Sequence, residues 1–198
     1  VKYENDANAA AVRGAYCRLV KQQQAEPSGD FATHVRRAFA LEQSPTAASN
    51  RAAFLALAML TVDDRVGELA GLDPKATRGC KLSPVVTTLN GRTDIPKHWA
   101  LSAALAVTTG TQFSQAMGEW KELADSISRQ SQFAVGDPSG FSFIDLVADR
   151  SGFLTAGLAM EDASAVTLAG RLASADQQDL LPPTLMRLED SMTNAEFV

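Results

Sequence analysis

The architecture of this 198-residue chain is indicated most directly by one segment, PKHWALSAALAVTT at residues 96–109. When the segment is placed on a helix at about 100° per residue, apolar side chains point in nearly every direction. A helix that is apolar all round is buried, and alanine favours both the helix and close contact with neighbouring helices. The segment therefore predicts an Ala-rich buried central helix.

Further helices are predicted on both sides of this segment from apolar periodicity and from the turn residues that separate the periodic stretches. Their predicted ranges are 6–25, 31–42, 45–60, 112–130, 142–159 and 161–174. Residues 84–89, which contain four β-branched side chains in a row, are expected to form either one helical turn or a short strand. The sequence predicts an all-α fold, a single-domain multi-helix bundle over residues 1–198.

Helix ends are predicted from capping residues. Asp30 is a suitable N-cap for the second helix, and Ser44, which a proline follows, is a suitable N-cap for the third. Thr61 with Asp64 resembles a capping box. Gly71 suits the left-handed position after a helix.

Charge and hydropathy exclude a nucleic-acid partner and a transmembrane span. The net charge is −5, and lysine and arginine are not clustered as phosphate binding requires. The apolar runs at 52–62, 100–107 and 153–160 are all shorter than the roughly 20 residues that a membrane span needs. These runs are therefore predicted to be buried core helices.

The cysteines and the first residue bear on the compartment. Cys17 and Cys80 lack the spacing of a metal site, so they form either one disulfide or two buried free thiols. The chain begins at Val1, which is expected where a leader or lipid anchor has been removed or where the chain is a fragment.

Two polar side chains interrupt the central helix. His98 and Ser102 are four residues apart, so they lie one turn apart on the same face. Because the helix is predicted to be buried, both side chains need hydrogen-bond partners inside the protein.

The helix from Ser142 supplies two suitable partners, Asp145 and Asp149. They lie opposite the predicted apolar stripe of Phe143, Val147, Leu154 and Leu158. Their own face carries only small residues, Ala148, Gly152, Ala156 and Ala159. Such a face admits a neighbouring helix, and two enclosed carboxylates at this spacing require a proton or a cationic neighbour. We expect His98 within hydrogen-bonding or water-bridging distance of Asp145 or Asp149.

Candidates outside this cluster are weaker. On the predicted helix 112–130, Glu122 points away from the apolar stripe, with Lys121 and Asp125 flanking it, which is typical of a solvated face. His34 is predicted to be a surface residue, and both tryptophans are predicted to lie in the core, Trp99 and Trp120.

Four motifs resemble the YfiM-type family of periplasmic lipoproteins. They are DIPKHW at 94–99, SAA at 102–104, KELAD at 121–125 and SGFSFIDLVADRSG at 139–152. The family has a similar order of D-K-x-x-H-F, K-E-x-x-D and G-x-S-x-x-D-x-x-x-D-x-x-G. The resemblance covers about residues 94–156, and Lys97 departs from it by directly preceding His98. It implies a periplasmic or cell-envelope location, which favours a Cys17–Cys80 disulfide, and it names no reaction.

Two functions remain open. In the first, the chain is a helical envelope scaffold or partner-binding module, and His98, Asp145 and Asp149 form a buried network that fixes helix packing. In the second, it is a hydrolase of an envelope component that uses these residues and Ser102 for acid–base or metal-assisted catalysis. One histidine with two carboxylates suits a hard cation better than zinc, so the metal and cofactor are left open. The expected partner is an envelope protein or a cell-wall component.

Overall fold

The prediction of an all-α fold is confirmed. The computed structural model describes residues 2–40, 44–80, 82, 85–109 and 142–187, and every regular element among them is helical. The elements are α1 (Lys2–Ala25), α2 (Phe31–Phe39), α3 (Ala47–Thr61), η1 (Asp64–Ala70), η2 (Pro74–Cys80), α4 (Ile95–Thr109), α6 (Phe143–Met160), α7 (Ala165–Leu172), α8 (Gln177–Leu180) and η3 (Pro183–Arg187). The predicted helix 112–130 lies outside the described residues.

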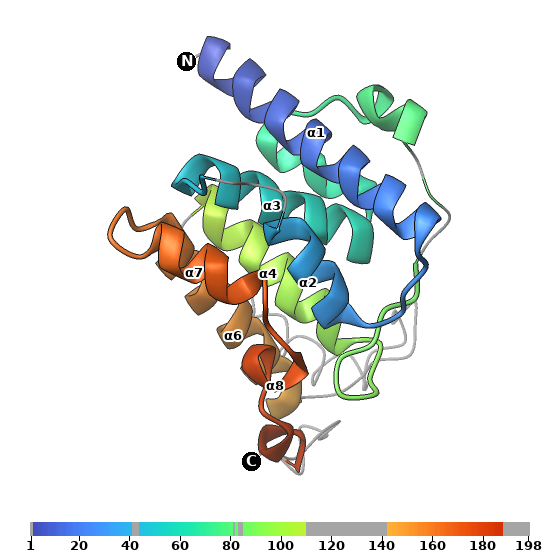
Figure 1. Ribbon diagram of the computed structural model, residues 1–198, viewed down its shortest axis with the longest axis vertical. Helices are drawn as coiled ribbons and strands as arrows, with labels where there is room; N and C mark the ends of the chain where they lie inside the picture. Colours follow the sequence, from blue (N-terminus) through green and yellow to red (C-terminus); the bar gives the residue numbers. More distant parts are fainter. Residues whose placement is uncertain (1, 41–43, 81, 83–84, 110–141, 188–198) are drawn as a thin grey trace, which may run out of the picture.

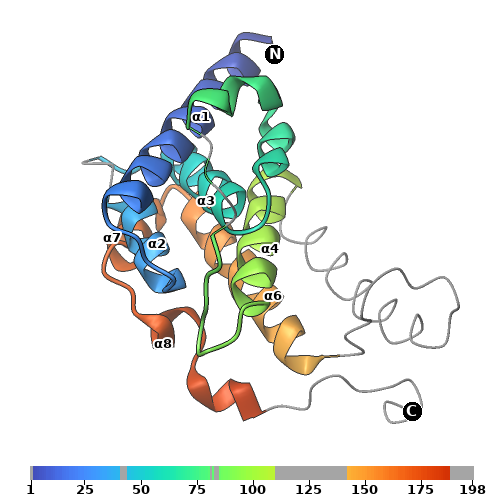
Figure 2. The same ribbon diagram turned by 90° about the vertical axis from the view of Figure 1, so that its right-hand side faces the viewer.

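The described helices are arranged around α4 (Figures 1 and 2). α4 contacts α3 on one side and α6 on the other, and α1 packs across α3. α7 contacts both α2 and α6. The central place that the sequence predicts for residues 96–109 is therefore the one that α4 occupies.

The helix ends agree with the predicted caps at two positions and differ at two. The Asp30 side chain accepts a hydrogen bond from the Thr33 backbone, and Gly71 has the left-handed φ of 74° that its predicted role requires. The third helix is capped by Thr46 instead of Ser44, because Thr46 and Ser49 cap each other reciprocally. Asp63, not Thr61, caps η1 by accepting a hydrogen bond from the Arg65 backbone.

The expected strand is reduced to isolated contacts. Asp30 pairs with Thr88, and Leu89 pairs with Arg92, each as a single β-bridge. Asn90 and Gly91 turn the chain between the second pair with positive φ angles. This turn brings Arg92 to the start of α4, which matters for the site.

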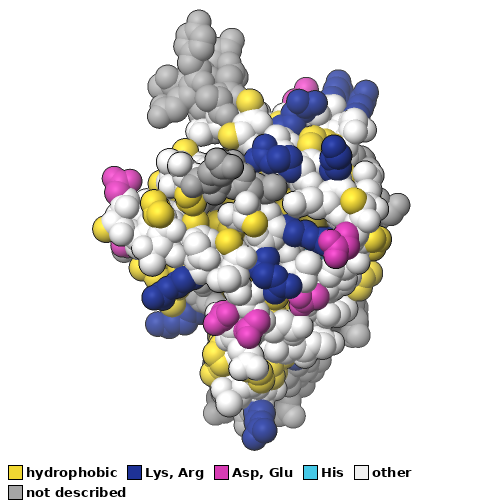
Figure 3. Space-filling model, viewed as in Figure 1, with side chains coloured by type: hydrophobic (Ala, Val, Ile, Leu, Met, Phe, Trp, Pro, Cys, Tyr) yellow, Lys and Arg dark blue, Asp and Glu magenta, His cyan; other side chains and the backbone are white. Residues whose placement is uncertain are grey.

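The prediction that His34 is a surface residue is wrong, since His34 is fully buried. Its Nε2 lies 3.0 Å from the carbonyl oxygen of Ser28, which requires the hydrogen on Nε2. Burial lowers the pKa of His34, and the nearby charge of Arg37 adds to that effect. Figure 3 shows no histidine on the face of the molecule seen in Figure 1.

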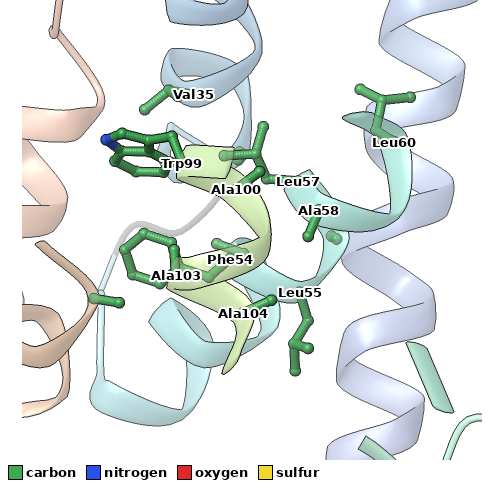
Figure 4. Close-up of a cluster of buried hydrophobic side chains, with 14 of the residues drawn as sticks. Val35, Phe54, Leu55, Leu57, Ala58, Leu60, Trp99, Ala100, Ala103 and Ala104 are labelled. Atoms are coloured by element: carbon green, nitrogen blue, oxygen red, sulfur yellow. The ribbon is translucent and has the colours of Figure 1, made fainter. Parts of the chain in front are cut away.

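The core is built around Trp99, as predicted. Trp99 is fully buried, and its ring meets Phe31 edge-on with the ring centroids 5.5 Å apart. Figure 4 shows α3 and α4 facing each other through Phe54, Leu57, Ala100 and Ala103, which are all buried. The small alanine side chains of α4 let the larger side chains of α3 pack directly against the surface of α4. An Ala-rich helix can therefore lie at the centre of the bundle with neighbours close on several sides.

One covalent link joins the N-terminal helix to the segment after α3. Cys17 of α1 and Cys80 of η2 form a disulfide across 63 residues of chain, which is the pairing predicted from the expected location. Of the helices that the structure describes, none is long and apolar enough to cross a membrane.

Candidate functional site

The candidate site lies where α4 and α6 come closest. Gly152 faces the carbonyl group of Trp99, and a Cβ at position 152 would overlap that oxygen. The small-residue face of α6, which includes Ala148 and Ala156, is fully buried in this contact. Ser142 fixes the start of α6 by accepting a hydrogen bond from the Asp145 backbone. The close approach brings the polar groups of the two helices within reach of one another.

The predicted contacts of His98 are present. His98 Nδ1 lies 3.2 Å from Asp149 Oδ1, and His98 Nε2 lies 3.4 Å from Asp145 Oδ2. The hydroxyl of Ser102 donates to Asp149 Oδ1 at 2.7 Å. Four residues that the sequence places on two separate helices therefore form one cluster.

The protonation of His98 follows from this geometry. A carboxylate oxygen only accepts hydrogen bonds, and a ring nitrogen must carry hydrogen to donate one. Both ring nitrogens of His98 face carboxylates, so the doubly protonated ring matches its surroundings best. The positive ring then lies between two negative groups, and this separates the carboxylates that would otherwise repel each other.

Arg92, which was not predicted as a site residue, extends the cluster. Its Nη2 lies 3.9 Å from Asp145 Oδ1, and its guanidinium also bonds the carboxylate of Asp94. Burial alone would raise the pKa of Asp94, but the hydrogen bonds and charge of Arg92 hold it below its usual value. The available signal for Arg92 was its place directly after the Asn90-Gly91 turn and two residues before Asp94.

The cluster is largely enclosed. The side chains of Asp145, Asp149 and His98 keep 3%, 8% and 13% of their surface exposed. Across the described ranges, no group of three or more histidine, cysteine, aspartate or glutamate side chains is arranged to hold a metal ion. Asp149 Oδ2 has no hydrogen-bond partner among the described residues.

The prediction that the apolar run 153–160 is buried is wrong for Leu154 and Leu158, and most of the apolar stripe of α6 is exposed. Phe143, Leu154 and Leu158 keep 37%, 48% and 49% of their surface exposed, whereas the opposite, small-residue face is buried. Large apolar side chains bury more surface each, but small ones let two helix backbones approach, and that approach decides the orientation of α6. The weaker candidates Lys121, Glu122 and Asp125, and the predicted core residue Trp120, lie outside the described residues.

The chain matches no protein-family model, no curated protein and no solved structure. The resemblance over residues 94–156 therefore remains a prediction, and the chemistry of the cluster follows from its own geometry.

Proposed function

We propose that this protein is a helical scaffold or partner-binding module of the cell envelope, in which the His98 cluster holds α4 against α6. The observation that carries the proposal is the surroundings of His98, where each ring nitrogen faces a carboxylate oxygen. These surroundings suit a doubly protonated ring, and such a ring has no free lone pair with which to accept a proton or bind a metal ion.

Ser102 takes part in the contact between the two helices. The hydroxyl of Ser102 donates to Asp149, which itself lies beside His98, so the serine stabilises the carboxylate. Such a network ties two helices together at a defined register.

An envelope location is supported by the disulfide. Disulfides form and persist in oxidising compartments and are rare in the cytosol. The Cys17–Cys80 bond fits such a compartment, as does the resemblance of residues 94–156 to a periplasmic family. Partner binding is supported by apolar side chains on α6 and α7 that are about half exposed or more. These side chains are Leu154, Leu158 and Val166.

The alternative is a hydrolase of an envelope component that uses His98, Asp145 and Asp149. Asp149 Oδ2 favours it, because a buried oxygen without a hydrogen-bond partner among the described residues is a place where a cation or substrate group could bind. The enclosure of the cluster and the engagement of both ring nitrogens of His98 count against it.

Two variants and a metal analysis separate these functions. His98→Ala leaves two buried carboxylates without the ring, so we expect a loss of about 1–3 kcal/mol in the free energy of unfolding. Asp149→Asn still accepts the hydrogen bond from Ser102, so we expect a smaller loss. Urea unfolding measures both, and the exposed Asp162→Asn is the matched control.

The hydrolase alternative makes the opposite prediction. If the purified protein holds a stoichiometric divalent metal ion that the folded Asp149→Asn variant loses, the proposal that the His98 cluster serves only to hold α4 against α6 is wrong. The same holds if the protein degrades a cell-wall preparation and folded Asp149→Asn does not.

A further inference from the structure

A cavity of about 440 Å³ lies between α1, the end of α3, the chain that follows η2 and the start of α4, and none of its lining residues belongs to the His98 cluster. Its volume is within the range of small-molecule sites in proteins. Tyr16 of α1 and Leu82, which line it, are close in sequence to Cys17 and Cys80, so the disulfide joins two walls of the cavity.

Three buried residues with hydroxyl groups line this cavity, Tyr16, Thr61 and Thr87, each less than 5% exposed. Among the described residues, Thr61 Oγ1 has no hydrogen-bond partner, although a helical threonine can bond the carbonyl one turn back. Burial raises the pKa of Tyr16, and the charges of Asp64 and Asp63 add to the rise, so its phenol stays protonated at neutral pH. Buried hydroxyls without partners cost free energy unless something binds them.

The rest of the lining is apolar inside and of mixed charge where it is exposed. Met59, Leu82 and Val85 supply aliphatic surface. Lys97 is exposed, and Asp63 is paired with Arg65 through Asp63 Oδ1 and Arg65 Nε at 2.9 Å. Asp64 also lines the cavity, so its two carboxylates are matched by two cations, Lys97 and the Arg65 that pairs with Asp63, and these four groups carry no net charge.

We propose that this cavity is a binding site for an uncharged amphipathic molecule, with a short aliphatic part and a hydroxyl, carbonyl or amide group. The aliphatic part would lie against Met59, Leu82 and Val85, and the polar group would bond the hydroxyls of Tyr16, Thr61 or Thr87. Neutral hydroxyls satisfy a neutral polar group, but they do not offset the cost of desolvating an ion. The cavity therefore selects against carboxylates and ammonium ions of the same length.

The test compares three probes of equal chain length, 1-hexanol, hexanoate and hexylamine, by titration into ¹⁵N-labelled protein. We expect hexanol to produce saturable amide shifts at cavity residues, and the two ions to bind at least about five-fold more weakly, as for the loss of one or more neutral hydrogen bonds. Hexanoate or hexylamine binding as tightly as hexanol would overturn the proposal, as would shifts that do not saturate or that centre elsewhere.

The variants Thr61→Val and Thr87→Val keep the shape of the side chain and remove its hydroxyl. We expect at least one of them to weaken hexanol binding about five-fold. Because the Thr61 hydroxyl has no hydrogen-bond partner among the described residues, Thr61→Val should also raise the urea midpoint of the ligand-free protein, which a structural threonine would lower. Thr167→Val on the exposed side of α7 is the matched control. Unchanged hexanol binding in both cavity variants contradicts the proposed contacts.

Discussion

His34 and His98 illustrate how the same residue type takes opposite roles in one fold. His98 lies between two carboxylates, and a positive ring suits that position. His34 bonds one carbonyl oxygen through Nε2, and its Nδ1 has no hydrogen-bond partner among the described residues. A proton added at Nδ1 would place a charge in an apolar setting near Arg37. His34 is therefore the group from which acid destabilisation is expected.

We predict that His34 makes stability fall in mild acid. Its pKa in the folded protein is below the ordinary value of 6.5, so the unfolded chain binds the proton more tightly. The free energy of unfolding should be fully retained above pH 6.5 and should decrease as the pH falls through that value. Urea unfolding of the protein and of His34→Gln, at several pH values, measures the effect.

The difference between the two proteins isolates His34, because every other titrating group is common to both. His34→Gln keeps a donor for the carbonyl of Ser28 and cannot gain a charge. The free energy of unfolding of His34→Gln should therefore change less between about pH 7.5 and pH 5 than that of the unchanged protein. The difference should roughly equal the contribution that the lowered pKa of one histidine makes to the free energy of unfolding. Parallel curves would show that His34 is protonated as easily in the folded state as in the unfolded one.

At the scale of helices, the contact between α4 and α6 is set by small residues. Periodicity predicted α4 well, because a helix that is apolar on every face is buried whichever face is turned toward the core. For α6, the predicted packing of the small-residue face is confirmed, whereas Leu154 and Leu158, in a run that was predicted to be buried, are about half exposed. The size of an apolar side chain alone does not state which face meets a neighbour. The enclosed Asp145 and Asp149 were the useful signal, since their small neighbours are unusual on a solvated face.

Gly152→Ala should be strongly destabilising. The added Cβ would overlap the carbonyl oxygen of Trp99, which is backbone and cannot rotate away. Either α6 moves back or α4 shifts, and both loosen the His98 cluster. We expect a loss of about 3 kcal/mol or slightly more, at the upper end for overpacking in a core. Thermal or urea unfolding measures it.

Gly170→Ala is the matched control for this substitution. Gly170 lies on α7, and a Cβ there would meet nothing within 4 Å. Alanine is the better helix former, so the control should be neutral or stabilise the protein by up to about 1 kcal/mol. Equal effects of the two substitutions would mean that α4 and α6 are not in close contact at Gly152.

At the scale of the whole molecule, distant parts of the chain are joined by a few specific links. The Asn50 side chain donates to the carbonyl oxygens of Ala159 and Ala165, across more than 100 residues, and so ties α3 to the junction of α6 and α7. Arg36 similarly donates to the carbonyl of Ala175. Such links depend on the tertiary arrangement and have no local pattern, which is why sequence reasoning found the helices and missed Arg92 and His34.

The disulfide is the strongest of these links, and its removal gives the last prediction. Cys17–Cys80 closes a loop of 63 residues that contains α2 and α3, so it restricts the unfolded chain substantially. The double variant Cys17→Ser with Cys80→Ser should lose about 2–4 kcal/mol in the free energy of unfolding. A reductant should lower the urea midpoint of the unchanged protein and leave that of the double variant where it is. Two free thiols in unfolded, unreduced protein would show that the bond does not form, and the argument for an oxidising compartment would lose its main support.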